Sequence, residues 1–315
     1  MNLPKLRIGN LIADLPIIQG GMAVRISTST LAAAVANEGG IGIIAGTGMK
    51  PEELQQEIRL ARSQTRGILG INVLFAVSQF ADLVKTAISE KIDLVISGAG
   101  FSRDMFGWGK ASGVPIVPIV SSAKLAVLAE KLGASAVIVE GKEAGGHLGT
   151  DRPMLEILQE VKAAVQIPVI GAGGVIDGFD IARAIQLGAD GVQMGTRFAA
   201  STESNASDAF KQAYVASAAD DVVHIHSPVG MPGQALRSSF TEMLERTERP
   251  ARPACVTCLK RCDHSFCIID ALKNAHRPGV AERALVFCGE NVYRIKEILS
   301  VHEIFQNLKS EWTTA

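Results

Sequence analysis

The chain has 315 residues, 47% of them hydrophobic, and its 31 basic and 32 acidic side chains leave a formal net charge of -1. Balanced charge is unlike the basic surface of a nucleic-acid binder. The sequence begins without an apolar leader and contains no run of about 18 apolar residues, which argues against secretion or membrane insertion. We therefore expect a cytoplasmic protein with neither a nucleic-acid nor a membrane partner.

Eight short apolar runs rich in Val, Ile and Gly recur along the first 200 residues. Most of them lack polar alternation, which is typical of parallel strands covered on both faces. The runs span residues 15–20, 40–46, 68–75, 94–100, 115–120, 136–141, 168–174 and 191–196. Helical patterns between them span residues 28–40, 51–63, 78–91, 101–113, 121–134, 151–165 and 177–189.

Strands that alternate with helices in this way predict an α/β fold, a closed (β/α)8 TIM barrel. An open, doubly wound sheet is the alternative. A bare barrel needs about 250 residues, so the chain has room for more. We assign residues 1–204 to the barrel and 205–290 to a cap beside its mouth. Residues 291–315 are expected to form a C-terminal helix that packs back on the barrel.

Glycines concentrate where the predicted strands end, which is the edge where parallel barrels bind ligands. Glycine lets the backbone approach a ligand closely, and backbone N–H groups at such turns can bind an anion. The loops after strands seven and eight usually hold phosphate, so Gly173, Gly174, Gly195 and Thr196 are the phosphate candidates. The alternative is that these tight turns need glycine for geometry alone.

His147 follows the sixth predicted strand, in a loop that also contains Gly145, Gly146 and Gly149. An imidazole that is neutral near pH 7 can exchange a proton with a substrate. An isolated histidine is more often structural. The position of this one at the end of a strand makes it the candidate catalytic residue.

The motifs PIIQGGM, GINV, EAGGHLG, PVIGAGGV and GADGVQMGTRF occur in this order. As a set they resemble the nitronate monooxygenase (2-nitropropane dioxygenase) family, which includes the flavin-dependent enoyl-acyl-carrier-protein reductases of the FabK type. The resemblance covers essentially the whole chain and implies a TIM barrel with an extra domain that binds FMN. It places His147 near the flavin as base or proton donor. The cofactor-binding residues that we predict are Gly21, Met22, Asn72, Glu140, Gly146, Gly173, Gly174, Gln193, Met194, Gly195 and Thr196.

Two activities follow from the resemblance. In an enoyl reductase, NAD(P)H reduces FMN, a hydride passes to the β-carbon of an enoyl thioester, and His147 or a water that it holds protonates the α-carbon. In a nitronate monooxygenase, a nitronate passes one electron to FMN and oxygen completes the reaction. Residues 227–237 resemble the reductase branch, so we favour an enoyl reductase that acts on a thioester of acyl carrier protein or coenzyme A, as a homodimer. Three less favoured functions are a flavoprotein with a different redox role, a regulatory barrel without turnover, and a flavin-free isomerase or synthase.

Four cysteines, Cys255, Cys258, Cys262 and Cys267, lie within 13 residues with the spacing C-x2-C-x3-C-x4-C. In a reducing compartment such a group argues for a metal site over disulfides. Iron–sulfur clusters and structural zinc both use four ligands of this kind. The short, uneven spacing favours a [4Fe–4S] cluster over zinc, with His264 as a spare ligand and four metal-free thiols as the alternative.

Several other polar residues have weaker patterns. Cys288 stands apart and is predicted to be a core thiol. His224 and His226 alternate in a strand-like run and should face one side, for packing, substrate contact or a metal pair. Arg197 and Arg237 could meet a phosphate or lie in surface ion pairs.

Overall fold

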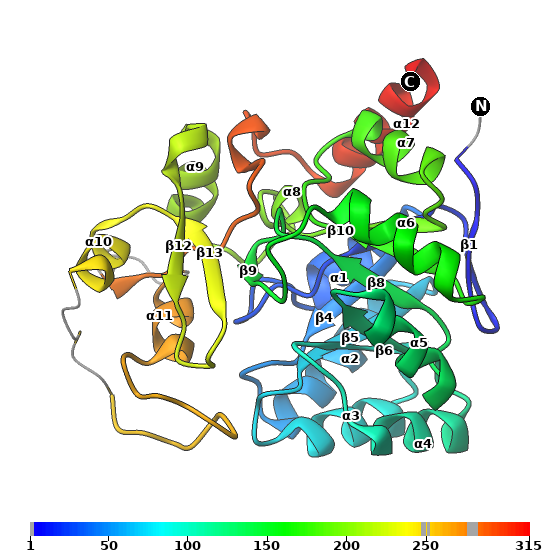
Figure 1. The fold of residues 1–315 in the computed structure, drawn as a ribbon, viewed down its shortest axis with the longest axis horizontal. Coiled ribbons are helices and arrows are strands. Elements are labelled where there is room, and N and C mark those ends of the chain that lie inside the picture. The colour runs from blue at the N-terminus through cyan, green and yellow to red at the C-terminus, as the bar shows by residue number, and fades with distance from the viewer. Residues whose placement is uncertain (1–2, 247–249, 251–252, 276–282) are drawn as a thin grey trace.

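The structure is a computed structural model that describes residues 3–246, 250, 253–275 and 283–315. A barrel with its surrounding helices forms the larger part, and a smaller cap lies beside it, with strand β9 (Gly146–His147) at the junction (Figure 1). Within the described residues, no helix has the length and apolar character needed to cross a bilayer.

The eight predicted strands are all present and form one closed parallel barrel, in the order β10-β11-β3-β4-β5-β6-β7-β8. This confirms the closed barrel and excludes the open sheet. The strands are nearly all buried on both faces, which explains why their sequences lack alternation. Their bounds are β3 Ile17–Gln19, β4 Ile41–Ala45, β5 Ile68–Leu74, β6 Leu94–Gly98, β7 Ile116–Val120, β8 Val137–Glu140, β10 Val169–Ala172 and β11 Gly191–Met194.

The seven predicted helices of the barrel are confirmed, and a short helix follows the last strand. Local signals set their ends: Ser102 caps one helix at its start, and Gly113 ends it in the left-handed conformation (φ 71°). The bounds are α1 Ser29–Asn37, α2 Pro51–Gln64, α3 Phe80–Ser89, α4 Arg103–Ser112, α5 Ala123–Leu132, α6 Met154–Ala164, α7 Gly178–Gln186 and α8 Thr196–Ala199.

An N-terminal hairpin that we did not predict closes the bottom of the barrel. It consists of β1 (Leu6–Ile8) and β2 (Leu11–Ala13), which pair antiparallel. Leu6 and Ile8 are buried and pack with Ile18, Ile43 and other barrel side chains. The bottom is therefore sealed, and a ligand must use the opposite end.

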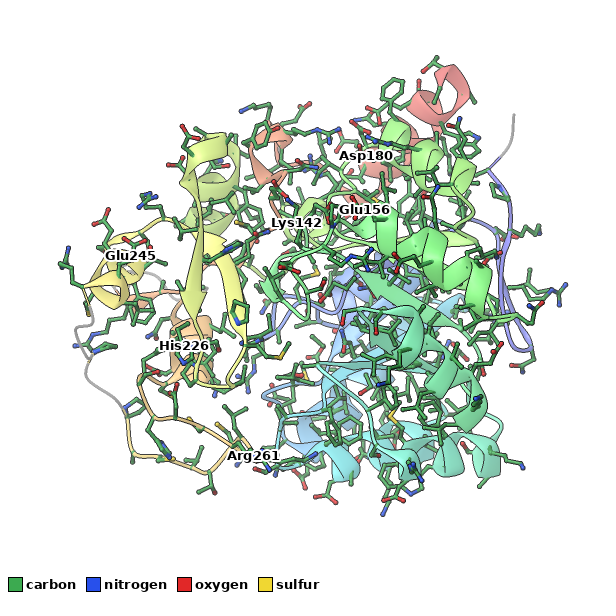
Figure 2. All side chains as sticks on the ribbon, in the orientation of Figure 1. Lys142, Glu156, Asp180, His226, Glu245 and Arg261 are labelled. Atoms are coloured by element: carbon green, nitrogen blue, oxygen red, sulfur yellow. The ribbon has the colours of Figure 1, made fainter. Side chains whose placement is uncertain are left out.

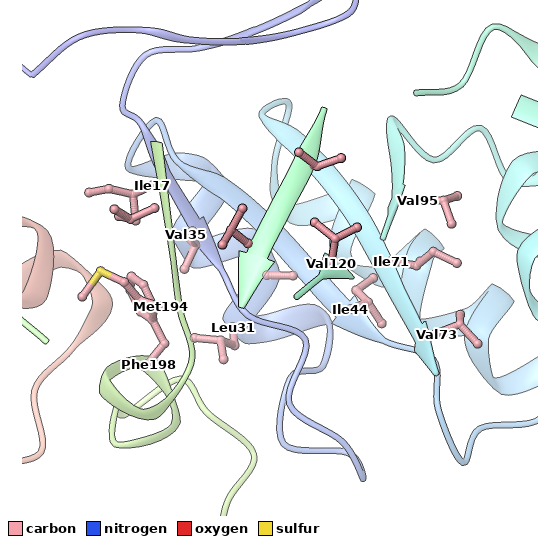
Figure 3. Packing of buried hydrophobic residues seen from close by; sticks show 14 of the residues in the cluster. Ile17, Leu31, Val35, Ile44, Ile71, Val73, Val95, Val120, Met194 and Phe198 are labelled. Atoms are coloured by element: carbon pink, nitrogen blue, oxygen red, sulfur yellow. The ribbon is translucent and has the colours of Figure 1, made fainter. Parts of the chain in front are cut away.

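The main core lies between the barrel strands and the surrounding helices. Figure 3 shows part of it, with Met194 and Phe198 near Ile17 and with Leu31 and Val35 of α1 behind the strands. Burial of side chains of this size stabilises a fold by about 1.5–3 kcal/mol each. This layer holds the strand ends, and thus the loops above them, in fixed positions.

The cap is built around an antiparallel hairpin. Strand β13 pairs on one side with β12 and on the other with β9, which belongs to a barrel loop. The cap hairpin and the barrel loop that carries His147 are therefore strands of the same sheet. The two strands of the hairpin are β12 Val222–His226 and β13 Pro232–Leu236. The other cap elements are α9 Asp208–Ala216, η1 Ala219–Asp221, α10 Ser239–Glu245 and α11 Ile268–Asn274.

The last helix packs on the barrel, but it is shorter than the predicted stretch that starts at residue 291. A 3-10 turn, η3 (Val292–Arg294), comes first, and α12 (Val301–Thr314) begins only after Ser300. The side chains of Ser300 and Glu303 form a capping box, which defines the helix start. Phe305 and Leu308 of α12 are buried in the main core, and the helix packs on α7 and α1.

Candidate active site

A cavity opens where the barrel strands end, between the barrel and the cap. His147 lines it, together with ten of the eleven residues predicted to bind the cofactor. These ten are Gly21, Met22, Asn72, Glu140, Gly146, Gly173, Gly174, Gln193, Gly195 and Thr196. The structure thus brings together residues from strands that are far apart in the sequence.

Met194 is the exception. Its side chain is only 1% exposed and packs in the main core, not in the cavity. Neighbouring residues of a strand point to opposite faces, so Gln193 and Met194 cannot both face the barrel interior. The backbone of Met194 still supports the site, because its carbonyl oxygen accepts a hydrogen bond of 2.8 Å from Gly20 N.

A buried polar network holds the loop after β3 against the cavity. The Gln19 amide donates to Ser27 Oγ at 2.9 Å, and the backbone N–H of Met22 donates to the same oxygen at 2.9 Å. Gly21 is required here because a Cβ at this position would lie 2.3 Å from Cβ of Asn72. The close approach of Gly21 to Asn72 places Met22 and Asn72 in the lining of the cavity.

The loops after β10 and β11 form a backbone cradle. Gly173 and Gly174 have φ of 106° and 75°, a conformation that favours glycine. The Asn291 amide donates to the carbonyl oxygen of Gly174 at 2.8 Å, and Gly289 N donates to Thr196 Oγ1 at 2.9 Å. The turn at residues 289–291, which follows the cap in the sequence, is therefore hydrogen-bonded to both loops of the cradle.

Gln193 provides a test of whether the cavity fits a flavin. Its side chain is 8% exposed and lines the cavity, and its Oε1 has no hydrogen-bond partner within the described residues. A buried amide oxygen without a donor is costly, so a ligand with N–H groups would satisfy it. With the glycine cradle nearby for a phosphate, the residues present fit FMN.

Glu140 ends β8 and also lines the cavity. Burial raises the pKa of its carboxyl from 4.5 to about 8. At neutral pH the group is therefore mainly protonated and can donate a hydrogen bond. A neutral acid can be buried at this position at little cost, whereas a carboxylate there would need a partner.

His147 is held by the cap sheet. It lies on β9, opposite Gly233 of β13, and its ring packs edge-on against Phe287 with the centroids 5.2 Å apart. Its Nε2 lies 2.7 Å from the hydroxyl of Ser227. Burial lowers the pKa of the imidazole from 6.5 to about 4, so the ring is neutral at pH 7.

The cap side of the cavity is apolar. Within the described part of the chain, the cap contributes no charged side chain to the cavity lining. The apolar wall, as we call it, consists of Val229, Leu259, Ile268, Ile269, Leu272 and Phe287. A substrate that fills the space between this wall and the barrel would place a hydrocarbon group there.

The four clustered cysteines do not form a metal site in the structure. Among the residues described, no group of three or more His, Cys, Asp or Glu side chains could hold a metal ion. Cys255 is exposed, and Cys258, Cys262 and Cys267 are half-buried. Burial raises the pKa of the Cys258 thiol, and the thiols of Cys267, Cys262 and Cys255 add to this effect. The three other thiols therefore influence the titration of Cys258, but the arrangement of the four is not that of a set of metal ligands.

The loop that bears these cysteines docks on the barrel. Ser78 N donates to the carbonyl oxygen of Cys258 at 2.9 Å, and Lys260 N donates to that of Ala76 at 2.8 Å. Arg261 extends from the same loop (Figure 2). Leu259, between these anchors, belongs to the apolar wall. The loop therefore forms part of the cavity.

The other polar candidates have local partners. His224 and His226 share the exposed face of β12, as predicted, and bond separately to Gln234 (2.8 Å) and Asp263 (2.8 Å). His226 extends from the cap, away from the barrel (Figure 2). Arg197 is buried and donates to two backbone carbonyl oxygens, while Arg237 lies 3.8 Å from Glu245.

The two remaining candidates among the cysteines and histidines are Cys288 and His264. Cys288 is 1% exposed in an apolar cluster, which confirms it as a core thiol, and burial raises its pKa. His264, the spare metal ligand of the prediction, has φ of 59° and belongs to no metal-binding group among the described residues.

Several site residues were not predicted: Tyr214, Ser227, Phe287, Gly289 and Asn291. All except Ser227 line the cavity, and Ser227 contacts it through His147. Only the Gly289–Asn291 turn carries a sequence signal, because Gly and Asn together favour a tight loop. The others lie in the cap, whose position on the barrel no local pattern reveals.

The protein is a (β/α)8 barrel that is sealed at its bottom. Its mouth holds a cofactor-sized cavity with a neutral histidine. These features are those of an enzyme of the TIM-barrel class. The family model described as nitronate monooxygenase matches residues 6–98 and 76–311. The chain belongs to this family of oxidoreductases.

Solved structures agree with this assignment. FabK from Thermotoga maritima is 35% identical, with 95% of this chain and 93% of that chain covered and a TM-score of 0.84. The nitroalkane oxidase of Streptomyces ansochromogenes is 25% identical, with 96% of each chain covered and a TM-score of 0.83. The two relatives thus fit the fold about equally well but carry different names.

A curated relative carries a third name. The (3aS,4S,5R,7aS)-5-hydroxy-7a-methyl-1-oxo-octahydro-1H-indene-4-carboxyl-CoA dehydrogenase of Rhodococcus jostii is 34% identical over 232 residues. That match covers 74% of this chain but 65% of the relative, so the chain spans just under two thirds of its length. The family is therefore clear, while its members differ in substrate.

Proposed function

We propose that the protein is an FMN-dependent NAD(P)H oxidoreductase that reduces the carbon–carbon double bond of an enoyl thioester. The observation that carries this proposal is the apolar wall that lines the same cavity as His147, because it offers a place for a hydrocarbon chain beside a proton-exchanging group. The greater identity to FabK than to the nitroalkane oxidase supports it. The acyl carrier, either acyl carrier protein or coenzyme A, and a homodimeric assembly stay predictions.

Different predicted cofactor residues would bind different parts of FMN. The cradle of Gly173, Gly174, Gly195 and Thr196 would hold the FMN phosphate, and Gln193 Oε1 would accept a hydrogen bond from the ring. When bound, FMN supplies the hydride chemistry that protein side chains lack. The backbone around Met22 and Asn72 would then limit where the ring and the substrate can lie.

His147 acts on the substrate as a neutral imidazole, because burial holds its pKa near 4. Hydride addition at the β-carbon moves the π electrons of the double bond toward the α-carbon and the thioester oxygen. A neutral imidazole N–H can stabilise that charge and give its proton to the basic α-carbon, after which water restores the proton. The apolar wall excludes other water from the reacting carbons.

Nitronate oxidation is the second candidate function. It is supported by the description of the family and by the nitroalkane oxidase among the solved neighbours. A nitronate is small and anionic, however, and would leave the apolar wall largely uncovered. We therefore rank it below enoyl reduction.

An anaerobic titration with NADH and NADPH separates the two functions. We expect rapid bleaching of the visible flavin band by one of the nucleotides, followed by reoxidation when an enoyl thioester is added. An alkyl nitronate serves as the comparison substrate. A flavin that stays oxidised with both nucleotides and is reduced only by the nitronate would replace this proposal with nitronate oxidation.

An iron–sulfur cluster on the four cysteines also stays a proposal. Its support is the C-x2-C-x3-C-x4-C spacing of the four cysteines, and we derive no catalytic step from it. Protein purified without oxygen is expected to contain iron and acid-labile sulfide, and both should be lost in Cys258→Ser. Zinc in place of iron would indicate a structural site, and the absence of all three would leave four free thiols.

A further inference from the structure

The hydrogen bond between His147 and Ser227 joins two segments that are eighty residues apart. Ser227 lies in the turn between β12 and β13 and is fully buried. The turn is closed by Ser227 N, which donates to the Met231 carbonyl at 3.2 Å, and by Gly230 N, which donates to the Ser227 carbonyl at 2.9 Å. Since β13 also pairs with β9 at His147, both partners of the hydrogen bond are held by the same small sheet.

The surroundings of Ser227 show whether its hydroxyl or Nε2 of His147 is the donor in their hydrogen bond. A buried hydroxyl hydrogen needs an acceptor, because leaving it without one destabilises the fold. Within the described residues, His147 Nε2 is the only partner of the Ser227 hydroxyl. The hydroxyl must therefore donate to Nε2, which leaves this nitrogen without a proton.

The tautomer of His147 follows from this direction. A neutral imidazole carries one proton, so with Nε2 as acceptor the proton is on Nδ1. Nδ1 has no hydrogen-bond partner among the described residues, and His147 lines the cavity. The nitrogen available to a ligand is thus a donor.

We propose that Ser227 is a positioning residue that holds His147 as the Nδ1–H tautomer, so that the ring presents an N–H donor to a substrate oxygen. This inference rests on the proposed function and narrows the substrate class. A thioester carbonyl, which gains negative charge during reduction, accepts such a hydrogen bond. Removal of a proton from a neutral nitroalkane would require a free lone pair on Nδ1, which this tautomer lacks. A nitronate has already lost that proton, so the flavin titration above separates it from an enoyl thioester.

The test measures the tautomer directly in the FMN-loaded protein. Nitrogen-15 NMR on protein labelled at its six histidines distinguishes protonated from unprotonated ring nitrogens, and His147→Ala assigns the signal. We expect Nδ1 protonated and Nε2 unprotonated in the wild type. Ser227→Ala should shift the signal toward a mixture of tautomers, and Ser227→Thr should restore it.

Turnover provides the second readout. Ser227→Ala is expected to lower kcat by about tenfold, the effect of one lost hydrogen bond in the transition state. The KM for the thioester should change less, and Ser227→Thr should recover activity. Ser201→Ala is the matched control, because Ser201 is equally buried and its hydroxyl donates to the Phe198 carbonyl at 2.7 Å, without a histidine.

Wild-type protein with the proton on Nε2 would overturn the inference, and so would a tautomer that Ser227→Ala leaves unchanged. The wild-type spectrum decides the first point even if Ser227→Ala fails to fold. The expected tautomer in a protein that reduces no enoyl thioester would support the role of Ser227 and contradict only the proposed function.

Discussion

Replacement of His147 by alanine is expected to lower kcat for enoyl-thioester reduction by about 10²–10⁴-fold, the usual contribution of a positioned acid or base. The reason is that His147 is the candidate proton donor in the cavity and that burial keeps it neutral and poorly solvated. Flavin content and the rate of flavin reduction by NAD(P)H should change little, because the cradle is on other strands. Stopped-flow measurements of the two half-reactions would show the loss in the second one only.

A second histidine provides the control for this experiment. His302 is exposed on α12 and pairs with Glu38 at 2.8 Å, far from the cavity lining. His302→Ala should keep wild-type turnover. If His147→Ala keeps it as well, His147 has no part in the chemistry and the family histidine has another role here.

Replacement of Glu140 by glutamine is expected to stabilise the flavin-free protein, increasingly so as the pH rises. The native carboxyl has a pKa of about 8 against an ordinary value of 4.5, so the folded state binds a proton that the unfolded state releases. Stability of the wild type therefore falls between pH 4.5 and about 8, by at most ~5 kcal/mol. Glutamine is neutral throughout and avoids this loss.

The measurement is the free energy of unfolding by denaturant, for both proteins, at pH 5, 6.5 and 8. The difference should be near zero at the lowest pH and largest at the highest. The pKa of His147, lowered to about 4, acts with the opposite sign but equally in both proteins, so it cancels. Glu156→Gln, at an exposed carboxyl, should stay within about 0.5 kcal/mol of the wild type at each pH. A difference for Glu140→Gln that does not grow with pH would mean that the carboxyl is already ionised.

Much of the barrel could be predicted because its strands and helices are defined locally. Each strand is a short apolar run buried on both faces, and several helices have a cap or turn signal, as at Ser102 and Gly113. The N-terminal hairpin had no comparable signal, since its three-residue strands are too short for a pattern. The helix predicted from residue 291 begins only at Val301, because the capping box at Ser300 sets its start.

The sequence predicted the residues of the candidate site that lie on the barrel, but not those that lie on the cap. Glycines at strand ends must face the mouth, so Gly173, Gly174 and Gly195 could be assigned from their positions alone. Met194 was assigned wrongly to the cofactor site. Side chains along a strand alternate between its two faces, so the Met194 side chain lies in the core and only that of Gln193 lines the cavity.

The barrel, the mouth as the ligand edge and His147 as the candidate acid or base could all be inferred from the sequence, because each depends on a local pattern or on strand direction. The position of the cap on that mouth could be known only from the folded chain. Folding pairs β13 with β9, brings Ser227 to His147 and Asn291 to Gly174, and makes Leu259 and Phe287 part of the cavity wall. These contacts join residues that are far apart along the chain, and such contacts come from packing of the whole fold, which no short stretch of sequence encodes.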